Sequence, residues 1–138
     1  LAELKRSIAT KNLGNHVTFT GHRSDLRNIM AISKVVLSLS KEPEAFGRTV
    51  TEALSLGIPV IGYDHGGVSE QLETLFPEGR VAVSDYRQAA RTIHDLLNKI
   101  EVIIKPNEVF TLEKMCKDTL ALYQDLTLNR PDRSADNI

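Results

Sequence analysis

Two short runs of β-branched and apolar residues restrict most strongly the fold open to this chain. They are Val35-Val36-Leu37-Ser38-Leu39 and Pro59-Val60-Ile61-Gly62-Tyr63. Both are nearly continuous in apolar character, which is typical of strands that are buried on both faces of a parallel sheet. A helical pattern from about Arg48 to Leu56 lies between them, with its apolar residues on one side. This order predicts an α/β fold: a Rossmann-like parallel sheet with flanking helices and right-handed crossovers.

The rest of the chain extends the same alternation. Val17-Thr18-Phe19-Thr20 and Val81-Ala82-Val83 are predicted as two further strands, which makes four. Further helices are expected over residues 2–12, after a Ser24 cap with Leu26, Ile29 and Met30 on one side, after Gly66-Gly67, from Asp85 with Ala89, Ile93, Leu96 and Leu97 inward, and over about 111–126. Residues 1–128 are therefore predicted as one partial domain and residues 129–138, which are polar, as a disordered tail.

Composition narrows the functional classes. The chain has 138 residues, 41% of them hydrophobic and 25% charged, as in ordinary globular domains. A net charge of -1 gives no reason to expect nucleic acid as a partner. The single cysteine, Cys116, cannot form an internal disulfide, which favours a reducing, cytoplasmic location. The chain starts with Leu1 inside a helical pattern, so we expect a fragment or a chain whose front part was removed.

Two glutamates eight residues apart, Glu44 and Glu52, indicate the chemistry. The loop from Ser40 to Gly47 is expected at the carboxyl end of a strand, where ligands of open α/β sheets bind. Backbone amides at the start of the following helix favour an anion such as a phosphate. A carboxylate one turn further along would repel that phosphate, but it can accept bonds from neighbouring hydroxyls of a ribose. Glu44, on the other side of the phosphate, can likewise accept from sugar hydroxyls, so the pattern of hydroxyls, phosphate and hydroxyls predicts a nucleotide-sugar as ligand.

The residues around this pair carry a resemblance to a known family. They match the signature Glu, seven residues, Glu, with Phe-Gly shortly after the first Glu and a Gly-x-Pro-Val strand after the second: Glu44, Phe46-Gly47, Glu52-Ala53 and Gly57-Ile58-Pro59-Val60. The segment Gly66-Gly67-Val68-Ser69-Glu70 matches a further Gly-Gly-x-x-Glu. From Val17 to about Asp85 the chain resembles the C-terminal donor-binding domain of retaining GT-B glycosyltransferases of family four, the glycosyl transferases group 1. The helix from Phe110 to Leu126 is similar to that family's last helix.

The resemblance implies a role for each matching residue. Glu44, as the catalytic candidate, would contact the hydroxyls of the donor sugar, and Glu52 would bind the ribose. The other donor-binding residues implied are Phe46, Gly47, Arg48, Thr49, Gly66, Gly67, Gly21 and His22, the last two near the nucleobase. No metal and no cofactor are expected, because the nucleotide-sugar is a substrate and catalysis in the family is largely positioning and stabilisation of the departing diphosphate. The implied activity is hexosyl transfer to a sugar, glycan or lipid-linked acceptor in polysaccharide biosynthesis.

The sequence departs from the family pattern at its front. Two strands, a helix and an Arg/Lys pair of the family's domain are not present, and neither is the acceptor-binding N-terminal domain. The fold expected is therefore the C-terminal half of a GT-B fold without its first two strands. We expect these 138 residues alone to be inactive in transfer. Any peripheral membrane contact would come through the absent domain.

Simpler interpretations remain open beside these. Glu44 and Glu52 alone would be ordinary solvated acids, and only the surrounding motif makes that interpretation unattractive. Gly66-Gly67 is also typical of a tight turn, and Arg48 of a solvated side chain. The alternative function is a catalytically inactive GT-B-derived module that serves binding or assembly. A nicotinamide-binding Rossmann domain is disfavoured, because the glycines do not form Gly-x-Gly-x-x-Gly after a strand.

Overall fold

The computed structural model describes residues 1–128, and the tail predicted for residues 129–138 lies outside them. The elements are α1 (Ala2–Thr10), α2 (Leu26–Ala31), β1 (Val36–Ser38), α3 (Arg48–Ser55), β2 (Val60–Tyr63), α4 (Gly66–Leu75), the 3-10 helix η1 (Pro77–Gly79), β3 (Arg80–Val81), α5 (Tyr86–Asn98) and α6 (Leu112–Leu128). The alternation of strands and helices confirms the predicted α/β class.

The sheet has three strands in the order β1-β2-β3, and both pairings are parallel. Leu37 lies opposite Ile61, and Tyr63 lies opposite Val81. All four residues of the central strand β2 are buried, as its apolar run predicts. The edge strand β1 differs, because Leu37 is 48% exposed. Burial on both faces is therefore confirmed for β2 and is wrong for β1.

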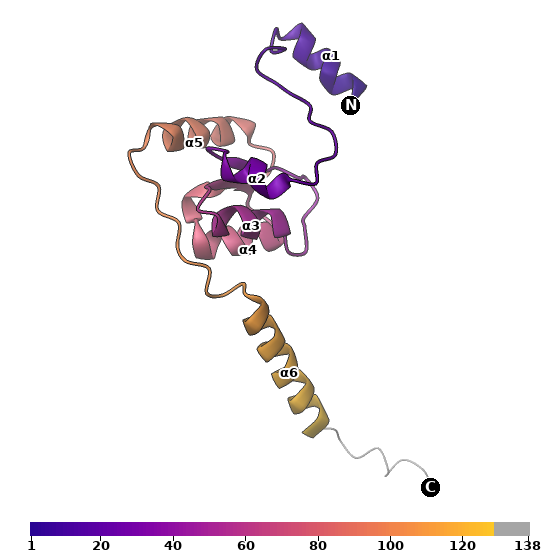
Figure 1. Ribbon diagram of the computed structural model, residues 1–138, viewed down its shortest axis with the longest axis vertical. Helices are drawn as coiled ribbons and strands as arrows, with labels where there is room; N and C mark the ends of the chain where they lie inside the picture. Colours follow the sequence, from indigo (N-terminus) through magenta and orange to yellow (C-terminus); the bar gives the residue numbers. More distant parts are fainter. Residues whose placement is uncertain (129–138) are drawn as a thin grey trace.

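The core lies between the sheet and the helices that cover it. Helix α3 turns Val50, Ala53 and Leu54 toward the sheet and contacts both β1 and β2. Helices α3 and α4 also contact each other and lie side by side in Figure 1, with α5 apart from them. The largest fully buried apolar side chains are Phe76, Ile61, Leu72, Leu75, Val50, Val60 and Val81. The sheet and the helices that cover it form the body of the molecule, and this body carries the loops after β1 and β2.

The first and last helices project from this body. Figure 1 shows α1 and α6 extending away from it in different directions. Neither helix contains a buried residue. The apolar side chains of α6 are exposed, with Leu112 71% and Tyr123 62% exposed.

Several sequence predictions are wrong in detail. Val17 to Thr20 is irregular and exposed, so there are three strands within residues 1–128 and not four. A strand needs a hydrogen-bonded neighbour, and this segment joins no strand of the sheet. The last strand is Arg80–Val81 and stops before Val83.

Two helix details also differ. The residue before α2 is Asp25 and not Ser24, and neither side chain caps the helix, because the Asp25 carboxylate accepts hydrogen bonds from Arg23. Leu97 of α5 is 50% exposed and does not face inward, whereas Ala89 and Leu96 are buried. The start of α5 is confirmed: the Asp85 carboxylate accepts the Gln88 N–H at 2.8 Å.

Candidate functional site

The loop between β1 and α3 lies against the start of α4. The N–H of Gly67 donates to the carbonyl of Glu44 at 2.8 Å. At the other end of the loop, Nε2 of His65 lies 3.0 Å from the carbonyl oxygen of Ser40. The loop that follows β1 is therefore attached to the loop that follows β2, both at the carboxyl edge of the sheet.

Gly66 and Gly67 make this attachment possible. A Cβ atom at Gly67 would lie 2.5 Å from the carbonyl oxygen of Ala45, and one at Gly66 would lie 2.7 Å from that of Glu44. Gly66 also has a φ of +56°, a conformation that side chains disfavour. Close backbone approach thus explains both glycines. The Gly67 N–H already donates to the Glu44 carbonyl. Contact of these glycines with a donor stays a prediction.

Gly47 brings the first glutamate to the start of α3. It precedes the helix with φ 79° and ψ 58°, in the left-handed region. A Cβ atom placed there would lie 2.9 Å from Cγ2 of Val68 and 3.6 Å from Oε2 of Glu44. The Glu44 carboxylate therefore lies beside the first turn of α3, where the amides of Arg48 and Thr49 have no intrahelical acceptor. The structure thus brings the loop carboxylate and the helix start together, and the binding of a phosphate at these amides stays a prediction.

The second glutamate borders a cavity of about 530 Å³ on the flank of α3. Its lining residues are Ser24, Leu26, Arg27, Thr51, Glu52, Ser55, Leu56, Asn107 and Phe110. A volume of this size lies within the range of small-molecule sites. The cavity mixes a carboxylate, a guanidinium and hydroxyls with apolar walls, which suits a ligand that has both a polar and a flat apolar part.

Arg48 pairs with Glu52 and not with the loop. Its Nη2 lies 3.3 Å from Oε1 of Glu52, one helical turn away, and its side chain is 84% exposed. An exposed pair of this kind holds its partners weakly. Arg48 therefore matches the solvated side chain that the sequence left open, and Glu52 is accessible at 46% of its side chain.

Gln71 is a site residue that sequence reasoning missed. It lies in α4, its side chain is fully buried, and it is the one buried polar residue of the described core. Its amide nitrogen donates to the carbonyl of Phe46, and its amide oxygen accepts from the hydroxyl of Thr51. The available signal was its position on the apolar face of α4, between Val68 and Leu75.

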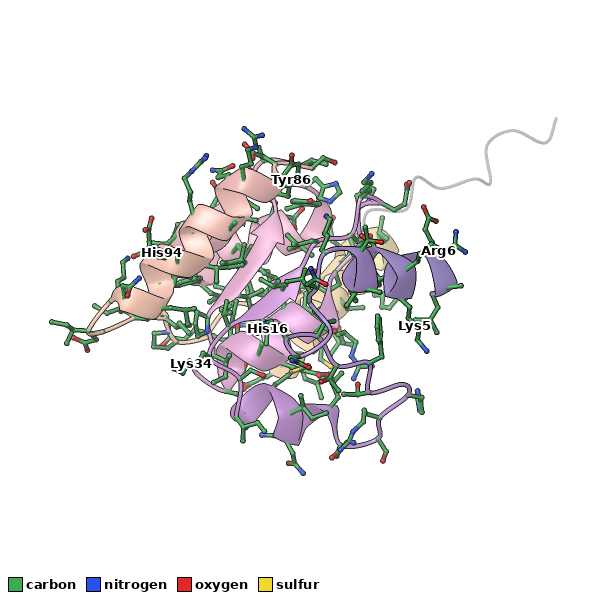
Figure 2. All side chains as sticks on the ribbon, turned by 90° about the horizontal axis from the view of Figure 1, so that it is seen from above. Lys5, Arg6, His16, Lys34, Tyr86 and His94 are labelled. Atoms are coloured by element: carbon green, nitrogen blue, oxygen red, sulfur yellow. The ribbon has the colours of Figure 1, made fainter. Side chains whose placement is uncertain are left out.

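Other predicted residues are not brought to the same place. Gly21 and His22 lie in an exposed loop, and a Cβ atom at Gly21 would meet nothing within 4 Å. Along residues 1–128 no hydrogen bond or ion pair joins either of them to Glu44 or Glu52. Ser24, two residues further on, does line the Glu52 cavity. Figure 2 shows His94 on α5, where its side chain is 78% exposed.

An ion-pair cluster fixes the end of β2. The Asp64 carboxylate accepts from the Ser69 hydroxyl and, in a forked arrangement at 2.8 and 3.0 Å, from the Arg80 guanidinium. The Ser69 hydroxyl, and after it Arg80, hold the pKa of Asp64 below its ordinary value. This cluster joins the end of β2 to α4 and β3, and Asp64 and Ser69 flank Gly66-Gly67 in the sequence.

The described residues contain neither a candidate metal site nor a candidate membrane span. Among residues 1–128 no three His, Cys, Asp or Glu side chains are grouped so that they would hold a metal ion. No helix in that range combines the length and the apolar character needed to cross a bilayer.

The parallel sheet, the glycine-led start of α3 and the two glutamates are the features by which this chain can be compared with known protein families. The family model "Glycosyl transferases group 1" matches residues 1–108. The chain belongs to this family.

The chain is also similar to individual proteins whose names are consistent with this family. Over 66 residues, 48% of this chain, it is 34% identical to N-acetyl-alpha-D-glucosaminyl L-malate synthase of Bacillus anthracis, and it covers 17% of that protein. The structure of Anabaena Alr3699/HepE in complex with UDP-glucose matches 70% of the chain with a TM-score of 0.65 and 30% identity. A glycosyltransferase from Rickettsia africae matches 94% of it with a TM-score of 0.66 and 26% identity.

This chain spans only a part of these proteins. It covers 27% of the Anabaena chain and 37% of the Rickettsia chain. The similarity to GT-B glycosyltransferases therefore concerns one region of larger molecules.

Proposed function

We propose that this chain is the donor-binding part of a retaining glycosyltransferase that transfers a hexose from a nucleotide-diphosphate sugar to a sugar, glycan or lipid-linked acceptor. The observation that carries the proposal is the junction at the start of α3. There the Glu44 carboxylate, the left-handed Gly47 and the first-turn amides lie together. The UDP-glucose bound by the similar Anabaena protein supports a nucleotide-sugar as the ligand.

Each part of the donor has a proposed partner. The diphosphate lies at the first turn of α3, where amides at Arg48 and Thr49 and the helix dipole favour negative charge. Glu52 accepts hydrogen bonds from the ribose hydroxyls, and the cavity beside it takes the nucleoside. Glu44 accepts from hydroxyls of the transferred sugar. Phe46 supplies backbone, and Gly66-Gly67 and Gly21-His22 lie at the edges of the donor.

Transfer requires more than these contacts. Catalysis by positioning needs an acceptor site and cationic groups that stabilise the departing diphosphate. We propose that residues 1–138 bind the donor in the cytoplasm, without a metal, and do not transfer the sugar by themselves. A radiolabel assay that detects transfer by these residues would contradict this part of the proposal.

Saturation-transfer NMR with UDP-, GDP- and ADP-sugars tests donor binding and identifies the base. One of the three is expected to give transfer to its ribose and sugar protons. Glu52→Gln should weaken binding of both the free nucleotide and its sugar, because both contain the ribose. Glu44→Gln should weaken binding of the nucleotide-sugar alone. Unchanged binding in both variants would overturn the proposed site.

A further inference from the structure

Gln71 connects the segments that carry the two glutamates. Its amide nitrogen donates to the carbonyl of Phe46, two residues after Glu44, and its amide oxygen accepts from the hydroxyl of Thr51, next to Glu52. One side chain of α4 thus contacts both the loop and α3. We propose that Gln71 is a positioning residue that fixes the Glu44 loop relative to the Glu52 helix.

The chemistry of the two contacts sets the orientation of the amide. A backbone carbonyl can only accept a hydrogen bond, so the Phe46 carbonyl must face the NH₂ group of Gln71. The amide oxygen then faces Thr51, whose hydroxyl can donate. An amide carries a donor and an acceptor at a fixed separation, and this site requires both. Neither glutamate nor leucine at position 71 supplies the same pair.

Burial makes these hydrogen bonds consequential. Gln71 is fully buried, so water cannot replace a lost partner at low cost. Thr51 lines the cavity with Glu52, whereas Gln71 does not reach it. Gln71 therefore acts through the segments it holds and does not touch the ligand. The Gly67 N–H, also in α4, holds the same loop through its hydrogen bond to the Glu44 carbonyl.

The functional consequence rests on the function proposed above. If Glu52 binds the ribose and Glu44 the sugar, their separation determines whether one nucleotide-sugar meets both. Loosening the loop should then reduce the additional affinity that the sugar gives, while the affinity for the nucleotide alone remains. A side chain that only stabilises the fold would lower both affinities together or neither.

The test compares Gln71→Met with Gln88→Met in the full chain. Gln88 of α5 is a matched control, since its side-chain oxygen accepts a backbone N–H, that of Ala82, at 2.8 Å. The first measurement is hydrogen exchange of the Gly67 amide without ligand. The second is calorimetric titration with UDP and with UDP-glucose, which gives the ratio of the two affinities. Gln71→Met should speed exchange and lower the ratio about tenfold, roughly the effect of one hydrogen bond. Gln88→Met should change neither.

Each other outcome has one meaning. Unchanged Gly67 exchange in Gln71→Met overturns the inference, and so does faster exchange with an unchanged affinity ratio. Wild-type chain that binds neither UDP and UDP-glucose nor the corresponding GDP and ADP compounds counts against the proposed function, while the exchange measurement still decides whether Gln71 holds the loop. If Gln71→Met does not fold, Thr51→Val removes one of the two hydrogen bonds. That variant should lower the affinity ratio by a smaller factor, and an unchanged ratio would overturn the inference.

Discussion

Two loops of this protein contain residues predicted to bind the donor, and the two loops differ in the contacts that hold them in place. The loop of residues 43–47 is attached to α4 by the Gly67 N–H, by Gln71 and by glycines that allow the backbones to approach closely. The loop of residues 21–25 is exposed, and its ion pair joins Arg23 to Asp25 two residues away. Hydrogen bonds from residues distant in sequence position the first loop, whereas the Arg23–Asp25 contact of the second loop stays within it.

The comparison shows what positions a binding residue. Three contacts from α4 fix the backbone around Glu44: the Gly67 hydrogen bond, the Gln71 hydrogen bond and the close approach at Gly66-Gly67. Gly21 has a left-handed φ of +67° but open space around it, so its conformation is local. Substitutions in the first loop should therefore affect the whole molecule, and those in the second should remain local.

The largest effect is expected for Gly67→Ala. The new Cβ would lie 2.5 Å from the Ala45 carbonyl oxygen and 2.6 Å from the Phe46 Cα, so backbone must move. We expect the free energy of unfolding to fall by about 3 kcal/mol in urea denaturation. Gly21→Ala, which meets no atom but keeps a left-handed φ, should cost about 1 kcal/mol. Gly14→Ala, with open space and no left-handed φ, is the control and should change little. Equal losses at Gly67 and Gly21 would contradict the comparison.

Phe110→Ala should have the next largest effect. The Phe110 ring packs edge-to-face on Phe46, with centroids 6.0 Å apart, and also lines the cavity beside Glu52. Removing it should lower the free energy of unfolding by about 2 kcal/mol, less than for a fully buried ring. Tyr86→Ala is the control, because Tyr86 is 69% exposed at the start of α5 (Figure 2). A thermal melt of Phe110→Ala that matches that of Tyr86→Ala would show that this segment does not support the loop.

A smaller effect is expected in acid, where two lowered aspartate pKa values can be compared. The Asp64 carboxylate is held by Ser69 and by Arg80, sixteen residues away, and Asp25 is held by Arg23. A carboxylate with a lowered pKa in the folded state stabilises it above the ordinary pKa of 3.8, and this stability is lost as the pH falls through the lowered pKa. The Arg23–Asp25 contact is local enough to form in the unfolded chain, so it should contribute little.

The measurement is the melting temperature between about pH 2 and pH 6. Asp64→Asn should lower stability by less than about 1 kcal/mol near neutral pH, because the carboxylate is partly exposed, and should flatten the acid limb of the curve. Asp25→Asn should follow the wild-type curve. A flattened limb in Asp25→Asn and not in Asp64→Asn would reverse the assignment.

Local patterns were sufficient to predict the central fold. The apolar runs located β1 and β2, and the residues that face inward from α3 followed from helical periodicity. The same reasoning failed for Val17 to Thr20, because alternation of two apolar residues does not provide a pairing partner. It also gave Leu97 an inward position, although α5 covers the sheet with a narrower face.

For the candidate site too, local patterns predicted the positions of residues but not the contacts between distant segments. The spacing of Glu44 and Glu52 placed one acid in a loop and the other in α3, as observed. The pairing of Gln71 with Phe46 and Thr51 spans 25 and 20 residues and depends on how α4 packs. Such a contact has no periodic signature, and the single hint was a polar residue on an apolar face. The roles of the two glutamates toward a donor remain predictions.

The smallest effect is expected for Arg48→Ala. The Arg48 side chain is 84% exposed, and its pair with Glu52 at 3.3 Å is screened by water. The melting temperature should therefore stay within about 1 °C of wild type, given the small contribution of such pairs. If backbone amides hold the phosphate, UDP affinity should change by less than about threefold, since helix termini bind anions without a side-chain charge. Removing the guanidinium also frees the Glu52 carboxylate for a ribose. A loss of tenfold or more, with a melting temperature unchanged, would instead make the Arg48 guanidinium a direct phosphate ligand.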